Sequence, residues 1–221
     1  MSKEKIFSKA WWKQYRWQTI LINLGIFFAF FVTCLLIDLL TKHYLFRWND
    51  EKTDGDLVVT YRGFIFGVRS LLHRGSTLEL NLGIPALHAI TIIIVLGAIL
   101  TSILIRDKMY RWIIPGLALI AAGSLGNMID RAAFGGVRDI VFIPWADRGT
   151  FNFADVDIIF GVIYIVISII VMVIVASVRD KKRAAQEEID DEYSESVAIK
   201  SKSEEQNNNN SDIVVDPTRK E

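Results

Sequence analysis

The sequence predicts an all-α membrane protein with four transmembrane helices, a small extracytoplasmic β element and a disordered C-terminal tail. Three observations support this fold class: four long uncharged stretches, basic residues flanking the membrane region, and a highly charged C-terminal segment. A helix needs about 20 apolar residues to cross roughly 30 Å of hydrocarbon. The alternating hydrophobicity that is typical of a membrane β-barrel is absent from these stretches.

The uncharged stretches contain no Asp, Glu, Lys or Arg. They cover residues 17–37, 80–105, 112–129 and 158–178, with lengths of 21, 26, 18 and 21 residues. The third is the shortest and only approaches the spanning length. With their flanking residues they predict helices at about 17–42, 80–105, 112–129 and 156–178.

Basic residues set the predicted topology and domain organisation. Five precede the first helix, three lie between the second and third, and four follow the last. The positive-inside rule therefore places both termini in the cytoplasm. We expect a cytoplasmic basic N-terminus at 1–16, a four-helix domain at 17–178 and a cytoplasmic tail at 179–221.

The first helix is interpreted as a retained span rather than a cleaved signal, because it is too long and no small-x-small cleavage site follows it. Cys34 within it is the only cysteine, which excludes an intramolecular disulfide and a cysteine-based metal cluster. A single cysteine in an apolar helix is interpreted as a packing residue.

Two further segments have a distinct composition. The stretches 57–61 and 64–66 are rich in β-branched and aromatic residues and are separated by Arg62-Gly63, which predicts a small outer hairpin. Residues 179–221 contain twelve acidic and eight basic residues and few large apolar ones. Such a segment buries too little apolar surface to offset its ordering entropy, so we expect it to be disordered.

Polar residues near the helix ends are the candidates for chemistry. Asp38 and Lys42 are four residues apart, so they share a helix face and are expected to pair. The alternative is an interfacial ion pair with Lys42 extended toward water. Asn127 and Asp130 also share a face; alone, they are equally compatible with interhelical hydrogen bonding.

Two aspartates, Asp139 and Asp155, have environments that differ. Asn152 is a favourable N-cap with Asp155 at the third helical position, which by itself explains both residues as a helix start. The positive helix end would also stabilise a charge on Asp155. Asp139 lies among apolar residues, so desolvation should raise its pKa. Two carboxylates with such different environments suggest a shared-proton pair of the kind that activates water in aspartic hydrolases.

Together these motifs resemble lipoprotein signal peptidase (signal peptidase II). The chain carries Asn-x-x-Asp-Arg, then Val-x-Asp, then Phe-Asn-x-Ala-Asp, after an upstream Asp-x-x-x-Lys. Their order and spacing make the resemblance specific over about residues 30–178. The matching residues are Asp38, Lys42, Asn127, Asp130, Arg131, Val137, Asp139, Phe151, Asn152, Ala154 and Asp155.

The resemblance implies an aspartyl endopeptidase of the bacterial cell (inner) membrane, with its active site toward the outer face. Its partners would be membrane lipid and prolipoproteins, cut before a diacylglyceryl-modified cysteine, with no nucleic acid. It assigns Asp139 and Asp155 as the catalytic pair. It assigns substrate-binding or supporting roles to Asn127, Asp130, Arg131, Asn152, Asp38 and Lys42. No cofactor or metal is implied, and the three histidines lack ligand spacing.

The chain departs from the family pattern at several positions. Arg138 stands where the family has an apolar residue, and it would either hold Asp139 ionised or point away. The family's Asn-x-Gly segment has no clean counterpart; the nearest candidates are residues 73–75 and 81–83. Asp157 is an additional carboxylate that points to a different helix face from Asp155.

Other classes of protein remain as alternatives. A small transporter would share the four helices, but transporters place their sites near the midplane, and here the acids flank the spans. A membrane scaffold would depend on the acidic tail. An intramembrane protease of another class would need Gly-x-Gly-Asp, which the sequence lacks.

Overall fold

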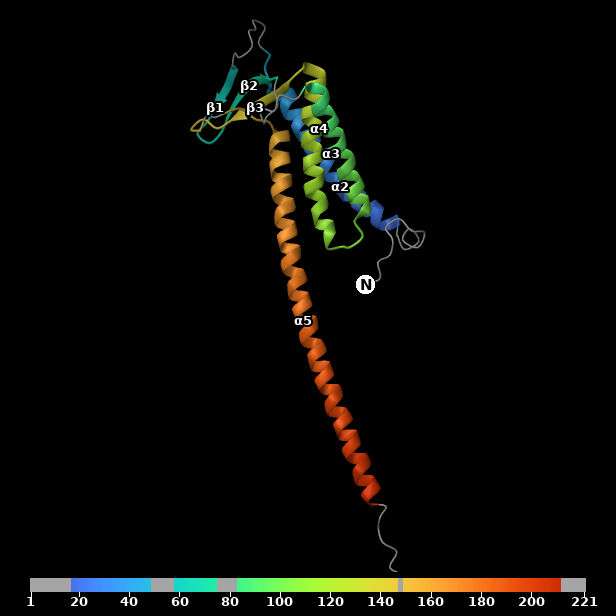
Figure 1. Ribbon diagram of the computed structural model, residues 1–221. Coiled ribbons are helices and arrows are strands. Elements are labelled where there is room, and N and C mark those ends of the chain that lie inside the picture. Colours follow the sequence, from blue (N-terminus) through green and yellow to red (C-terminus); the bar gives the residue numbers. More distant parts are fainter. Residues whose placement is uncertain (1–16, 49–57, 75–82, 147–148, 212–221) are drawn as a thin grey trace, which may run out of the picture. The chain divides into compact units, whose positions relative to one another are not determined.

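The computed structural model describes residues 17–48, 58–74, 83–146 and 149–211. The predicted N-terminal segment 1–16, most of the outer loop before the hairpin and the last residues of the tail lie outside these ranges. Within the described residues, four helices are long and apolar enough to cross a membrane, as predicted. They are α2 (Trp17–Leu45), α3 (Ile84–Leu104), α4 (Ile114–Phe134) and the first part of α5 (Phe153–Ser211) (Figure 1).

The helix boundaries differ modestly from those predicted. A short 3-10 turn, η1 (Tyr110–Ile113), leads directly into α4, which then continues beyond residue 129 to Phe134. Gly135 ends this helix with a φ of 69°, a left-handed conformation that glycine adopts without strain. The polar residues at the end of α4 therefore belong to the helix, where protein rather than lipid surrounds them.

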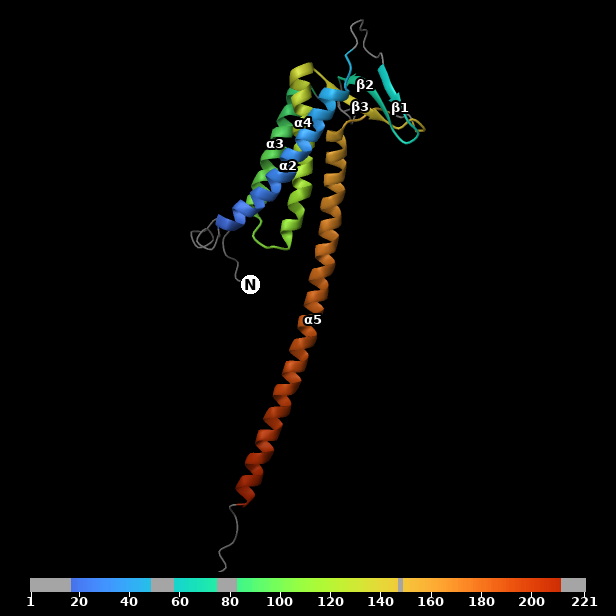
Figure 2. The same ribbon diagram turned by 180° about the vertical axis from the view of Figure 1, so that it is seen from behind.

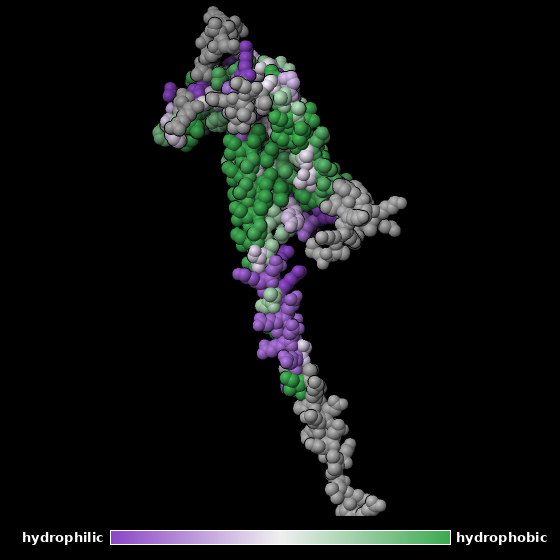
Figure 3. All heavy atoms as spheres, viewed as in Figure 1, coloured by the Kyte–Doolittle hydropathy of each residue, from purple (hydrophilic) through white to green (hydrophobic). Residues whose placement is uncertain are grey.

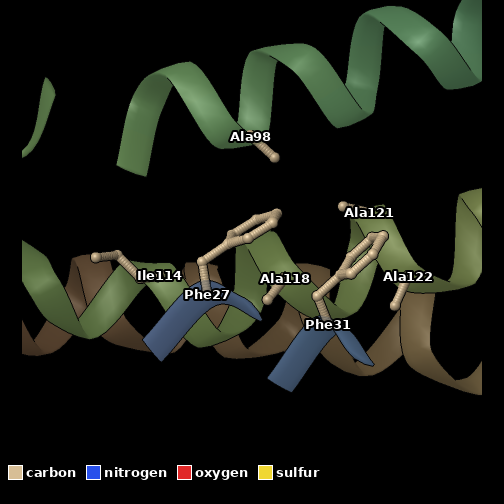
Figure 4. Close-up of a cluster of buried hydrophobic side chains, with 7 residues drawn as sticks. All are labelled: Phe27, Phe31, Ala98, Ile114, Ala118, Ala121 and Ala122. Carbon is tan, nitrogen blue, oxygen red and sulfur yellow. The ribbon is translucent and has the colours of Figure 1, made fainter. Parts of the chain in front are cut away.

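Helix α4 is the central helix of the membrane domain. In its most apolar 18-residue stretch, 50% of the residues are buried inside the protein, against 11% in α2 and 17% in α3. Small residues line its buried face, so Phe27 and Phe31 of α2 pack directly against it, as Figure 4 shows. Small side chains let membrane helices approach closely. The core cluster consists of Phe27, Phe31, Ala98, Ile114, Ala118, Ala121 and Ala122.

The outward surface of these helices is apolar. Large side chains such as Ile93 and Leu96 on α3 and Phe160 on α5 are exposed, which is unfavourable in water and favourable against lipid. On the face drawn in Figure 3, hydrophobic residues cover the membrane-spanning part of the helices. The molecular surface thus agrees with a multi-pass membrane protein.

A three-stranded antiparallel sheet lies at the end of the bundle where α4 ends and α5 begins (Figures 1 and 2). It consists of β1 (Val58–Arg62), β2 (Gly67–His73) and β3 (Val137–Phe142), in the order β1-β2-β3. This confirms the predicted β element. The apolar residues 64–66, however, form the turn between β1 and β2 rather than a strand.

The charged segment after the last span buries none of its described side chains between 177 and 200, and its predicted disorder stays a prediction. Helix α5 continues beyond its apolar part to Ser211, although every described side chain from 177 to 200 is exposed. Its Ala, Glu, Lys and Gln residues are strong helix formers, and side-chain bonds such as Gln186 to Asp190 support the helix locally. Local propensity, rather than burial, accounts for the helix.

Candidate active site

Asp139 lies on β3 and is positioned by the pairing of β3 with β2. It lies opposite Leu71 in the β2–β3 register, and only 6% of its surface is exposed. Phe151 bridges to the same strand: its N–H donates to the Val141 carbonyl at 2.9 Å. The strand and the start of α5 are therefore joined by backbone hydrogen bonds just before the second aspartate.

The start of α5 forms a reciprocal capping box. The Asn152 Oδ1 accepts the N–H of Asp155 at 3.0 Å, and the Asp155 Oδ2 accepts the N–H of Asn152 at 3.3 Å. The predicted N-cap is thus confirmed. The Asn152 amide also donates to Asp139 Oδ1 at 2.7 Å. One asparagine side chain therefore connects both aspartates.

Asn127 of α4 is the second amide of the cluster. Its Nδ2 donates to Asp155 Oδ1 at 2.9 Å. Its Oδ1 accepts from Asn152 at 3.2 Å and from the Lys42 ammonium at 3.1 Å. Because both amide ends are engaged, the orientation of this side chain is fixed.

The predicted pair on α2 is confirmed and lies deep in the protein. Lys42 Nζ is 2.8 Å from Asp38 Oδ2, and both side chains are fully buried. The alternative in which Lys42 extends toward water is therefore wrong: its ammonium is held by acceptors inside the bundle. Asp38 Oδ1 accepts the N–H of Ala154 at 2.9 Å, so the pair also contacts the first turn of α5.

Asp130 accepts from two elements at once. Its Oδ1 accepts from Arg138 Nη2 at 2.7 Å and from Nε at 3.2 Å, while its Oδ2 accepts the Arg138 backbone N–H at 3.0 Å. Lys42 Nζ lies 3.3 Å from the same Oδ2. The Arg138 guanidinium also covers the Phe134 ring at 4.3 Å. Arg138 thus points away from Asp139, which resolves the two orientations that the sequence left open.

The pKa of Asp139 is raised, as its apolar surroundings predicted. Burial, with a smaller contribution from the neighbouring charge of Asp155, raises the pKa of Asp139 to about 7. The hydrogen bond from Asn152 and the charge of Lys42 oppose this shift. Asp155 itself is only half-buried, and half-buried Arg131 interacts electrostatically with Asp155 and Asp139. A buried carboxyl whose pKa lies near 7, beside a half-buried second carboxyl, is suited to acid–base chemistry.

Asp157 lies outside this cluster. Its carboxylate hydrogen-bonds to the Cys34 thiol of α2 rather than to Asp139 or Asp155. This agrees with the expectation that it faces a different side of α5. Within the described residues, no group of three or more His, Cys, Asp or Glu is arranged to hold a metal ion.

Sequence reasoning missed two contributions to the cluster. The backbone N–H of Ala154 and the pairing of Arg138 with Asp130 were not anticipated. The pairing of Arg138 with Asp130 could have been found from the sequence. The two residues flank Gly135-Gly136, where the chain leaves α4 and turns into β3. The family's Asn-x-Gly segment keeps no assigned counterpart, since residues 75–82 lie outside the described residues.

Comparison with known proteins agrees with the cluster. A family model described as "Signal peptidase (SPase) II" matches residues 12–171. Lipoprotein signal peptidase of Syntrophus aciditrophicus is 32% identical over 151 residues, covering 61% of this chain and 86% of that protein. The enzyme of the same name from Streptococcus pneumoniae is 35% identical over 100 residues, or 45% of this chain and 65% of the other.

A solved structure agrees as well. A bacterial membrane enzyme determined by the in meso method at 2.3 Å resolution is similar with a TM-score of 0.55 and 25% identity, over 66% of this chain and 88% of that one. The family match covers most of the chain, including the first three candidate spans and the first part of the fourth. The chain therefore belongs to the signal peptidase II family of aspartic membrane peptidases.

Proposed function

We propose that this chain removes signal peptides from prolipoproteins, cutting the peptide bond before a diacylglyceryl-modified cysteine with Asp139 and Asp155 as the catalytic pair. One observation carries the proposal: the Asn152 side chain hydrogen-bonds to Asp139 and caps the helix turn that holds Asp155. The buried carboxyl with a raised pKa and the half-buried carboxylate thus share one support.

The pair would act on a water molecule held between the two carboxyl groups. One carboxylate accepts a proton from the water as its oxygen attacks the scissile carbonyl carbon, and the other carboxyl donates its proton to the carbonyl oxygen. Collapse of the tetrahedral intermediate breaks the C–N bond, and the leaving amine takes up a proton. Because the two groups share one proton, they titrate as a unit.

The surrounding residues would hold this arrangement in a dry environment. Asn127 fixes Asp155 through its amide, and Lys42 in turn fixes Asn127. Arg131 is half-buried and its charge interacts with that of Asp155, so it is suited to bind a polar group of the substrate backbone. We infer that Asp38 and Asp130 support the cluster rather than react.

The basic residues of the loops support an orientation in which both termini are cytoplasmic and the cluster faces outward. The diacylglyceryl chains of the substrate would then remain in the outer leaflet while the peptide reaches the aspartates. The exposed apolar surfaces of α2 and α5 would allow lateral entry from the lipid.

The test is cleavage of a purified diacylglyceryl-modified prolipoprotein by wild type, Asp139→Asn and Asp155→Asn. We expect wild type to cut before the modified cysteine and both variants to lose at least a hundred-fold in rate. Asp157→Asn is the matched control, because it removes a neighbouring carboxylate outside the cluster. If only one of the two aspartate variants loses activity, the assignment of a catalytic pair is contradicted. If folded wild type does not cut, the proposed function is contradicted.

A further inference from the structure

The Asp130–Arg138 pair is more elaborate than a helix-to-strand contact requires. Asp130 is fully buried, and Arg138 is 8% exposed. One carboxylate accepts three hydrogen bonds from Arg138, including its backbone N–H, and lies 3.3 Å from Lys42 Nζ. A buried ion pair rarely adds net stability, so the presence of this one suggests another role.

The position of this pair relates it to the catalytic residues. Arg138 immediately precedes Asp139 in β3, and successive side chains of a strand point to opposite faces. Arg138 therefore holds the strand from the face opposite to Asp139. Asp130 lies one residue before Arg131 at the end of α4, so the pair joins that helix end to the strand that carries Asp139.

We propose that Arg138 is a positioning residue for the catalytic pair: it anchors β3 to α4 through Asp130 and neutralises the Asp130 charge beside Asp139. This inference rests on the proposed function and deepens it, because it names how the protonation of the dyad is set. It concerns a residue at which this chain departs from the family pattern.

Charges around Asp139 come from the three helices α2, α4 and α5. Asp155 faces it from α5, Lys42 from α2, and Asp130 and Arg131 from α4. The negative charge of Asp130 raises the pKa of Asp139, while that of Lys42 opposes the shift. Arg138 and Asp130 form an ion pair. Removing Arg138 makes the charge near Asp139 more negative, and removing Asp130 makes it more positive.

The experiment follows this sign difference through the pH dependence of kcat/KM. The alkaline limb of the profile marks loss of the shared proton and is expected near the Asp139 pKa of about 7. Arg138→Met removes the closest cation from Asp130 and leaves only the longer contact with Lys42, so the limb should move up by roughly half a pH unit or more. Asp130→Asn leaves Arg138 uncompensated, so the limb should move down by a similar amount.

Two more variants separate charge from structure. Arg138→Lys keeps the positive charge and should retain the wild-type limb even if the rate falls, because lysine cannot reproduce the bidentate geometry. The double variant Asp130→Asn with Arg138→Met removes both charges and should return the limb toward wild type. Each variant is first shown to be folded by thermal unfolding in detergent.

The possible outcomes are distinct. If wild type cuts the lipid-modified precursor but Arg138→Met and Asp130→Asn shift the limb in the same direction, or not at all, the positioning role is overturned while the proposed function stands. If wild type does not cut, the proposed function fails first. Opposite shifts with recovery in the double variant support the inference.

Discussion

Burial of Asp139 couples the chemistry of the site to the stability of the fold. Its pKa rises from 3.8 to about 7, so the folded protein binds a proton that the unfolded chain releases in mild acid. The stability from this proton is complete below about pH 4 and is lost as the pH rises through about 7. Each pH unit in this window changes the free energy of unfolding by at most about 1.4 kcal/mol.

We therefore expect the Tm in detergent to fall between pH 5 and pH 8, and to fall less steeply in Asp139→Asn. The asparagine cannot ionise, so its contribution to this slope disappears. Thermal unfolding across this range measures both slopes. An unchanged slope in the variant would show that another group dominates the pH dependence.

Asn152 serves both as a helix cap and as a hydrogen-bond donor to Asp139, and two substitutions separate these roles. Asn152→Ala should lower stability by about 1 kcal/mol and activity by at least ten-fold, because both contacts are lost. Asn152→Ser keeps an N-cap oxygen but is too short to reach Asp139, so it should recover stability without activity. Paired Tm and cleavage measurements check this; equal recovery of both would contradict a separate role toward Asp139.

Two contacts of this cluster could be predicted because the residues that make them lie close together in the sequence. Asp38 with Lys42, and Asn152 with Asp155, have local spacings that determine shared helix faces and capping. The contact of Lys42 with Asn127 joins residues 85 positions apart, so no local pattern reports it. Arg138 was ambiguous because a neighbour along a strand can point to either face, and only the packing against α4 decides.

At the level of elements, α4 lies so close to α5 and α2 that glycine is required at two positions. A Cβ on Gly123 would collide with the Ala154 carbonyl of α5, and one on Gly126 would collide with the Asp38 carboxylate of α2. Both contacts lie beside the start of α5, where the second aspartate sits. The close approach of these helices is therefore a condition for assembling the site.

Gly123→Ala and Gly126→Ala should each lower the Tm and reduce cleavage at least ten-fold, because the Cβ displaces backbone or a buried carboxylate. Gly97→Ala on α3 is the matched control, since a Cβ there meets nothing within 4 Å. It should leave both quantities near wild type. Equal effects at all three positions would indicate a general loss of helix packing instead.

Helices and strands differed in how well they could be predicted. The helices follow from uncharged length alone, which depends on the membrane rather than on tertiary contacts. Strand β3 was not anticipated as a strand, because its pairing with β2 joins distant segments, such as Leu71 with Asp139. The residues 64–66 have strong β propensity but form a turn, since Gly67 and Arg62 pair on either side of them.

At the scale of the whole molecule, we expect cleavage to depend on the membrane domain and not on the tail. The family match ends at residue 171, and the described side chains from 177 to 200 are exposed. Truncation after Arg183 keeps the basic residues that follow the span and should leave cleavage within about two-fold of wild type. The scaffold interpretation expects loss of function instead, so cleavage by the truncated enzyme discriminates between the two.

The hydrogen bond from the Ala154 N–H to Asp38 joins residues 116 positions apart, the first membrane helix to the last. During synthesis, α2 enters the membrane long before α5 is made. Until then Asp38 lacks the N–H of Ala154 as a donor, and Asp155 does not yet exist. The proposed catalytic pair is therefore incomplete until the final span is inserted. A chain that stops short leaves the buried Asp38 carboxylate without one of its donors, and an incompletely satisfied charge within the bilayer is costly.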